Sequence, residues 1–159
     1  MSNPAPTKTP RRLARELALQ GLYQWQLTGN SIPVVEEVLE TGEETSADWA
    51  RADRGLMLSL LRSASQQAAE LEAEFVPFID RPVGELSPIE RSILLLGTYE
   101  LKHCPETPYR VVINEAIELA KNFGGTEGHR FVNGVLDKLA PRLRAVEVEH
   151  AKKNPPKRR

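Results

Sequence analysis

The stretch that decides the fold covers residues 87–101 and reads Ser-Pro-Ile-Glu-Arg-Ser-Ile-Leu-Leu-Leu-Gly-Thr-Tyr-Glu-Leu. It opens with a serine cap, a proline at the first helical position and Glu90 three residues after Ser87, a combination typical of a helix start. Its apolar residues then cover nearly the whole circumference of a helix. A helix that is apolar all round must be surrounded by other elements. We therefore predict a central, most buried helix from Ser87 to about Lys102.

Two further helices are predicted after this one. The first is opened by a Thr-Pro pair at 107–108, runs to Phe123 and ends at two glycines. The second begins near Thr126 and carries apolar residues at spacings of three and four. Pro141 should bend or end it, because proline lacks the backbone N–H that a helix interior needs.

The chain before the central helix is also predicted to be helical. The expected elements are a helix at 11–28, a short acidic helix at 33–41, an acidic loop at 42–48 and a long helix from about 48 to 75. None of the segments has a convincing strand pattern. The chain is therefore predicted to be all-α, with six or seven helices.

The length of 159 residues fits one domain with a real core. We predict a disordered tail at 1–10, a single helical domain at 11–149 and a disordered basic tail at 150–159. No apolar run approaches the roughly 20 residues of a membrane span, and the start has no hydrophobic stretch typical of a signal peptide. The expected location is the cytoplasm, without membrane contact.

The charge of the chain is small in total but unevenly distributed. A net charge of −1 argues against indiscriminate binding to nucleic acid, yet the beginning is basic, residues 36–53 are acidic and the end is basic again. The first predicted helix places Arg11, Arg12, Arg15 and Tyr23 on one arc of roughly 140°. Guanidinium groups pair with phosphate, and an aromatic ring can stack on an unpaired base. The ordinary alternative is a solvated basic face on which Tyr23 caps the core.

The last predicted helix carries a second candidate surface. Glu127 and Arg130 fall outside its core stripe, and Phe131 lies at the border of that stripe. An aromatic ring beside an arginine can stack on an unstacked base. Equally, Phe131 can simply close the core, as a phenylalanine at a helix border commonly does.

The sequence offers no case for catalysis. The usual spacings for a nucleophile, an acid–base pair, a metal site or a cofactor loop are all missing from it. The glycines at 124–125 resemble a phosphate loop only loosely and are explained as a helix stop, and the His103-Cys104 pair has no further ligand pair. We therefore predict no catalytic residue, no metal and no cofactor.

Four segments together resemble the NusB family of bacterial transcription antitermination factors. They are residues 11–26, 87–101, 109–121 and 130–138, in the right order and at the right separation, and the resemblance covers about residues 11–145. It implies an all-helical fold of two small bundles that share a long helix, and a role without enzymatic chemistry. In that family the protein pairs with NusE, which is also a small-subunit ribosomal protein. The pair binds the single-stranded boxA sequence of nascent ribosomal RNA and helps to build a processive antitermination complex on RNA polymerase.

The resemblance also implies roles for particular residues. The arginine-rich opening of the family and a nearby tyrosine match the first helix, and the start of the last helix lies close to the RNA. A carboxylate there would weaken binding by repelling phosphate. The residues that the resemblance assigns to RNA binding are Arg11, Arg12, Arg15, Tyr23, Glu127, Arg130 and Phe131. Glu90 completes the cap of its helix and, by resemblance, lies near the NusE interface.

Two other functions are weighed against this one. A helical domain that accompanies ribosomal RNA cytosine methyltransferases resembles the same family, but 159 residues leave no room for an α/β catalytic domain. A helical protein-interaction adaptor that never touches RNA is the alternative from another class. For such an adaptor, RNA affinity would be indifferent to Arg11, Arg12 and Arg15.

Overall fold

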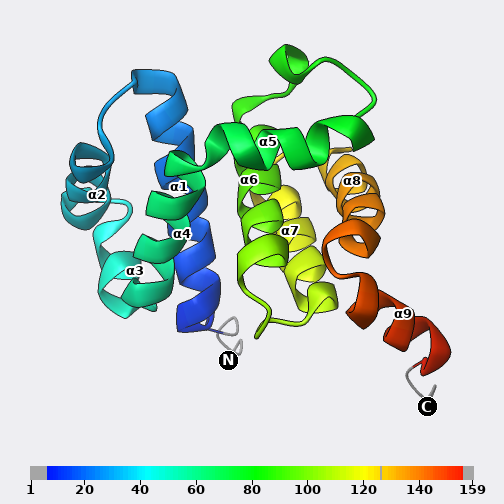
Figure 1. Cartoon of the computed structure of the whole chain (residues 1–159). Helices are drawn as coiled ribbons and strands as arrows, with labels where there is room; N and C mark the ends of the chain where they lie inside the picture. Colours follow the sequence, from blue (N-terminus) through cyan, green and yellow to red (C-terminus); the bar gives the residue numbers. More distant parts are fainter. Residues whose placement is uncertain (1–6, 126, 156–159) are drawn as a thin grey trace. The chain divides into compact units, whose positions relative to one another are not determined.

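The structure of the chain is a computed structural model that describes residues 7–125 and 127–155. Within these two ranges it contains nine α-helices, two short 3-10 helices and no strand (Figure 1). The all-α prediction is confirmed. The helix count exceeds the predicted six or seven, because one expected helix is divided into three and the last into two.

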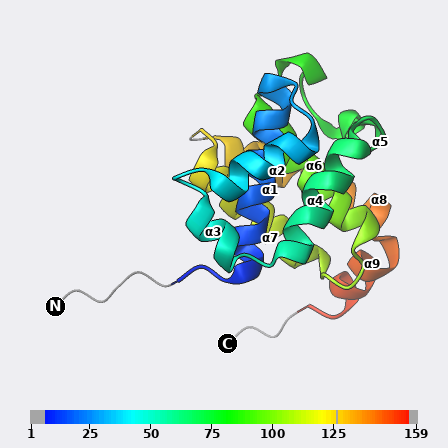
Figure 2. The same ribbon diagram turned by 90° about the vertical axis from the view of Figure 1, so that its left-hand side faces the viewer.

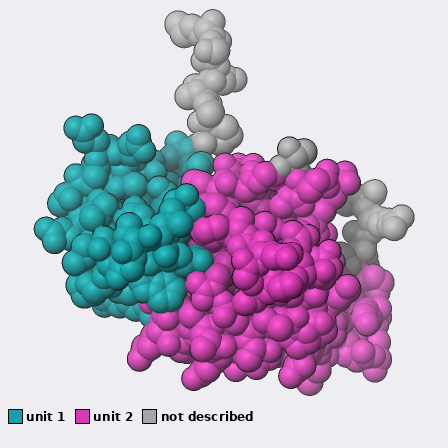
Figure 3. Space-filling model, turned by 90° about the horizontal axis from the view of Figure 1, so that it is seen from above, with its two compact units in different colours: residues 1–62 teal, residues 63–159 magenta. Residues whose placement is uncertain are grey.

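The chain folds as two compact units, residues 1–62 and residues 63–159 (Figure 3). The helices of the first unit are α1 (Pro10–Thr28), α2 (Ile32–Thr41), α3 (Ser46–Arg51) and most of α4 (Arg54–Gln66). Helix α1 packs against α2 and α3. A Cβ on Gly21 of α1 would lie 2.9 Å from Cδ1 of Leu61 and 3.2 Å from Cδ1 of Leu39. The glycine therefore lets two buried leucines approach the backbone of α1.

The second unit is built around α6. Its elements are α5 (Ala68–Phe75), η1 (Val76–Phe78), η2 (Val83–Glu85), α6 (Pro88–His103), α7 (Tyr109–Phe123), α8 (Gly128–Leu143) and α9 (Ala145–Lys153). Helix α6 packs against α5, α7 and α8, and α7 packs against α8 (Figures 1 and 2). Four consecutive residues of α6, from Ile93 to Leu96, are buried, and Oγ of Ser87 accepts a 3.0 Å hydrogen bond from the backbone N–H of Glu90. The predicted central helix and its serine cap are confirmed.

The expected long helix from about 48 to 75 is interrupted twice. Asp53 separates α3 from α4, because its Oδ1 accepts a 3.1 Å hydrogen bond from the backbone N–H of Leu56 and so caps a new helix. Gln67 then leaves helical geometry, with φ −101° and ψ 18°, between α4 and α5. The expected acidic loop at 42–48 ends early, since α3 begins at Ser46. The apolar spacing alone could not reveal these breaks, because it continues across them.

The C-terminal part of the chain is more ordered than the sequence suggests. Pro141 lies inside α8, which continues to Leu143, and α9 runs on to Lys153. Residues 150–153, part of the predicted tail, form the last turn of α9 in this structure. The rest of that tail from residue 156, and residues 1–6 of the predicted N-terminal tail, lie outside the described residues.

Candidate nucleic-acid interface

The start of α1 concentrates positive charge. Its first turn reads Pro-Arg-Arg-Leu over residues 10–13, and Oγ1 of Thr9 caps it by accepting a 3.1 Å hydrogen bond from the backbone N–H of Arg12. The N-terminus of a helix carries a partial positive charge of its own. Two arginines placed there add to that potential. The first turn of α1 is therefore electrostatically suited to bind an anion such as phosphate.

The predicted basic arc of α1 is exposed only at its two ends. The side chain of Arg11 is 51% exposed, Arg12 is half-buried and Tyr23 is exposed. Arg15, by contrast, is only 4% exposed, so the expectation that it lies on an open face is wrong. A helical wheel places polar residues outward by type, whereas a charged side chain can be buried when its polar groups find partners. Tyr23 lies about 18 Å from Arg11 along the helix axis, given the rise per residue of an α-helix.

Glu16 on the same arc is also buried, and its carboxylate is paired with Lys8. The Nζ of Lys8 lies 2.7 Å from Oε1 and 3.0 Å from Oε2 of Glu16. An ammonium bonded to both oxygens offsets the desolvation of the buried carboxylate. The two residues lie eight apart on either side of the helix cap, so no helical spacing signals the pair.

The first turn of α1 is fastened to the loop between α3 and α4. The backbone N–H of Asp53 donates a 2.9 Å hydrogen bond to the carbonyl of Pro10, and Nη2 of Arg51 donates a 3.3 Å hydrogen bond to the carbonyl of Lys8. The Oδ2 of Asp53 also lies 3.8 Å from Nη1 of Arg11. Sequence reasoning missed Asp53, although its position before Arg54 could have indicated a helix cap.

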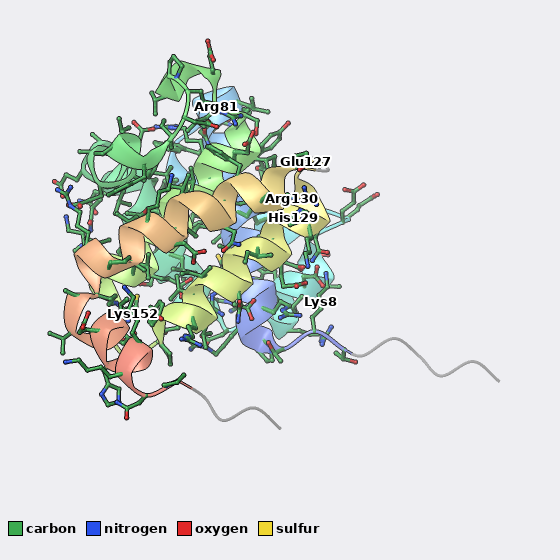
Figure 4. All side chains as sticks on the ribbon, turned by 90° about the vertical axis from the view of Figure 1, so that its right-hand side faces the viewer. Lys8, Arg81, Glu127, His129, Arg130 and Lys152 are labelled. Carbon is green, nitrogen blue, oxygen red and sulfur yellow. The ribbon has the colours of Figure 1, made fainter. Side chains whose placement is uncertain are left out.

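The start of α8 presents the second set of candidate residues. Glu127 and Arg130 are strongly exposed, and Nη1 of Arg130 lies 3.4 Å from Oε2 of Glu127 (Figure 4). Phe131 is half-buried, and the guanidinium carbon of Arg81 lies 4.2 Å from the centroid of its ring. Such a contact is a favourable cation–π interaction. One face of the phenylalanine is therefore covered by an arginine of the same unit.

No pattern in the sequence singled out Arg81. Its Nε donates a 2.8 Å hydrogen bond to Oδ1 of Asp80, and its Nη1 lies 3.9 Å from Oε2 of Glu90. The hydrogen bond to Asp80 raises the pKa of Arg81, and the same bond lowers the pKa of Asp80. Glu90 thus faces an arginine in addition to donating its N–H to the serine cap. Arg81 and Phe131 are 50 positions apart in the sequence, so only the fold brings them together.

A shallow hollow of about 180 Å³ lies beside this arginine–phenylalanine contact. Its wall includes two aromatic rings, two cationic side chains and one carboxylate. These groups belong to Phe78, Phe131, Arg130, Lys138 and Asp80. The hollow mixes apolar and charged groups, as sites that bind a base or a protein side chain commonly do.

The candidate residues are divided between the two compact units. The arginines and the tyrosine of α1 belong to residues 1–62, whereas the candidates on α8 and the partner candidate Glu90 belong to residues 63–159. In the part of the chain that the structure describes, no cluster of three or more His, Cys, Asp or Glu side chains could hold a metal ion. Among the same residues, none of the helices combines the length and the apolar character needed to cross a bilayer.

The fold and its two charged surfaces define a class of protein. Members of this class are small and all-helical, and arginines near the N-termini of their helices can bind an anionic polymer. Comparison with known proteins identifies the family within that class. The model of the NusB family matches residues 12–141, and the chain belongs to this family.

Individual relatives agree with this assignment. The chain is 64% identical over 146 residues to the transcription antitermination protein NusB of Azoarcus sp. (strain BH72), covering 92% of each chain. Among solved structures, NusB of T. maritima superposes with a TM-score of 0.72 at 27% identity, over 90% of this chain and 99% of that one. A chain in the crystal structure of the antitermination factors NusB and NusE in complex with dsRNA shares the fold, with a TM-score of 0.68 at 24% identity, over 84% of this chain and 97% of that one.

Proposed function

We propose that this chain is a non-enzymatic transcription antitermination factor that binds RNA in the cytoplasm. Its ligand in this proposal is the single-stranded boxA sequence of nascent ribosomal RNA, which it binds together with NusE to support processive transcription by RNA polymerase. The observation that carries the proposal is the capped, arginine-bearing first turn of α1 in a member of the NusB family.

Arg11 and Arg12 are assigned to phosphate in this proposal, and Tyr23 to a base further along the strand. Arginine guanidinium groups bind phosphate through paired N–H donors, while an aromatic ring accepts any base by stacking. Arg15 is too buried to reach phosphate in this conformation, so we assign it to holding α1 in place. With only a few arginines in contact, the salt dependence should be shallow, on the order of three to five ions released.

The start of α8 is assigned a second, smaller contribution. The side chain of Arg130 is 75% exposed, which suits a contact with phosphate. Arg81 covers one face of the Phe131 ring. A base can stack on the opposite face, or it can stack on the covered face after Arg81 has moved away. Glu127 would oppose the RNA by charge repulsion. The NusE contact is assigned to Glu90 and the neighbouring Arg81.

The pair of fused bundles implied by the family resemblance belongs to the same proposal. The boundary between the two compact units falls after Arg62, inside α4. This position supports α4 as the shared helix.

The proposal is tested by fluorescence anisotropy of labelled boxA RNA. The arms are boxA RNA, a scrambled RNA and a boxA duplex, each with and without NusE, for the wild type and Arg11→Ala/Arg12→Ala. The matched control is Arg62→Ala, which removes an exposed arginine of the same unit that pairs with Glu36 instead. We expect selective binding of single-stranded boxA that rises with NusE, falls at least tenfold in the double variant and is unchanged in the control.

Two results would overturn the proposal. If the wild type shows no preference for boxA even with NusE, the RNA role is wrong for this chain. If the wild type binds NusE while its RNA affinity is absent or indifferent to both α1 arginines, the adaptor function takes its place.

A further inference from the structure

We propose that Asp53 is an electrostatic brake on Arg11, which holds the RNA affinity of the first turn of α1 below its attainable value. The inference rests on the proposed function and names a residue that regulates the same surface. It is carried by the two separate contacts that the oxygens of one carboxylate make.

Asp53 is held by one hydrogen bond of its carboxylate and one of its backbone. Its Oδ1 accepts a 3.1 Å hydrogen bond from the backbone N–H of Leu56, which caps α4. The backbone N–H of the same residue donates a 2.9 Å hydrogen bond to the carbonyl of Pro10, the first residue of α1. These bonds hold Oδ2 close to the start of α1, 3.8 Å from Nη1 of Arg11. The acid therefore cannot swing away from the arginine without giving up its cap.

The ion pair between Asp53 and Arg11 lies where RNA can reach it. The side chains are 39% and 51% exposed, respectively. A phosphate that approaches Arg11 must share the guanidinium with the carboxylate, and the two anions repel each other. An exposed ion pair is weak, so its competition with phosphate should reduce RNA affinity by about two- to fivefold.

The negative charge of Asp53 is dispensable for the local fold, which makes the brake testable. Asparagine and aspartate are about equally good at the N-cap position of a helix. The change Asp53→Asn keeps an oxygen that can accept from Leu56 and leaves the backbone bond to Pro10 unaltered. It removes only the charge that faces Arg11.

The test measures boxA RNA affinity and its salt dependence for the full chain with NusE, in the wild type and four variants. They are Asp53→Asn, Arg11→Ala, the double variant and the control Glu36→Gln. Glu36 also pairs with an exposed arginine of the first unit, Arg62, so the control removes an equal charge from another ion pair. We expect Asp53→Asn to bind about two- to fivefold tighter and to gain about one released ion in the salt slope. The control should stay within the error of the wild type, and Asp53→Asn should have no effect once Arg11 is alanine.

The outcomes separate the brake from the proposed function. Wild-type binding that depends on Arg11 but is not tightened by Asp53→Asn would refute the brake and leave the RNA role standing. Equal tightening with and without Arg11, or equal tightening by the control, would show a general charge effect and also refute it. Failure of the wild type to prefer boxA would remove the proposed function and the brake together. Thermal unfolding of each variant checks that the fold is retained.

Discussion

Arg144 and Glu147 form a 2.6 Å ion pair that caps the end of one helix and the start of another. Arg144 is buried, and its Nε donates a 2.6 Å hydrogen bond to the carbonyl of Leu101. Its Nη2 reaches two more carbonyls at the end of α6, those of Glu100 and Cys104. The Oε1 of Glu147 accepts a 2.9 Å hydrogen bond from the backbone N–H of Tyr109, the first residue of α7. A cation thus meets the negative end of α6, and an anion meets the positive end of α7.

Replacing Arg144 should strongly destabilise the second unit. We expect Arg144→Ala to lower the free energy of unfolding by about 2–4 kcal/mol, because three carbonyls each lose one hydrogen bond and a buried side chain is lost. The matched control is Arg142→Ala, which removes a well-exposed arginine 3.7 Å from Glu74 and should cost under about 1 kcal/mol. The measurement is urea unfolding followed by circular dichroism, since both tryptophans of the chain lie in the first unit. Equal losses in the two variants would contradict the double-cap role.

Glu147 should make stability depend on pH in the acidic range. Burial alone would raise its pKa, but the hydrogen bond from the Tyr109 backbone and the contact with Arg144 outweigh burial and lower it. A carboxyl whose pKa is lower in the folded state adds stability above its unfolded pKa, about 4.5, and loses it as pH falls through the folded pKa. The difference in melting temperature between the wild type and Glu147→Gln should therefore be constant from about pH 6 to 8 and shrink below about pH 4.5. A difference that grows on acidification would contradict this sign.

The sequence predicted the elements whose signals are local. The helix over residues 10–28, the central α6 and the helix ending at Phe123 each combine a periodic apolar stripe with a start or stop signal. The division at Asp53 was missed because the apolar stripe continues across it. Leu143 and Val146 left a helical extension after Pro141 open, but the separate helix α9 could not be derived because it depends on Arg144. That arginine looked like one more charge in a basic tail, while its carbonyl partners lie more than 40 positions earlier.

The sequence predicted where the candidate residues lie on their helices, but not which other residues cover them. In the structure, Arg11 in the first turn of α1 and Arg130 at the start of α8 are exposed, and their role in RNA binding stays a prediction. The burial of Arg15 was not foreseeable, because burial depends on what covers a residue rather than on its place on a wheel. The cover of Phe131 by Arg81 likewise needs a loop far away in the sequence.

Gly134 should be a position where the fold gains stability from a simple substitution. It lies inside α8. Apart from its chain neighbours and the backbone of its own helix, no atom of the described residues lies within 4 Å of where its Cβ would stand. Since glycine is a poor helix former, Gly134→Ala should raise the free energy of unfolding by about 0.5–1 kcal/mol. The contrasting variant is Gly21→Leu, which drives a side chain into Leu61 and should destabilise the first unit. Thermal unfolding measures both, and a destabilised Gly134→Ala protein would show that α8 is strained at this point.

Glu127 should weaken RNA binding from the start of α8. Its carboxylate is strongly exposed and lies 3.4 Å from Arg130, so it both repels phosphate and partly neutralises the arginine. We expect Glu127→Gln to tighten boxA RNA binding by about two- to fivefold in anisotropy titrations with NusE. The matched control is Glu118→Gln, because Glu118 is a half-buried acid of the same unit, with a side chain 42% exposed, that pairs with Lys121 three residues later on α7. That control should leave the affinity unchanged. Unchanged or weaker binding by Glu127→Gln, or equal tightening in both variants, would show that RNA does not approach the start of α8.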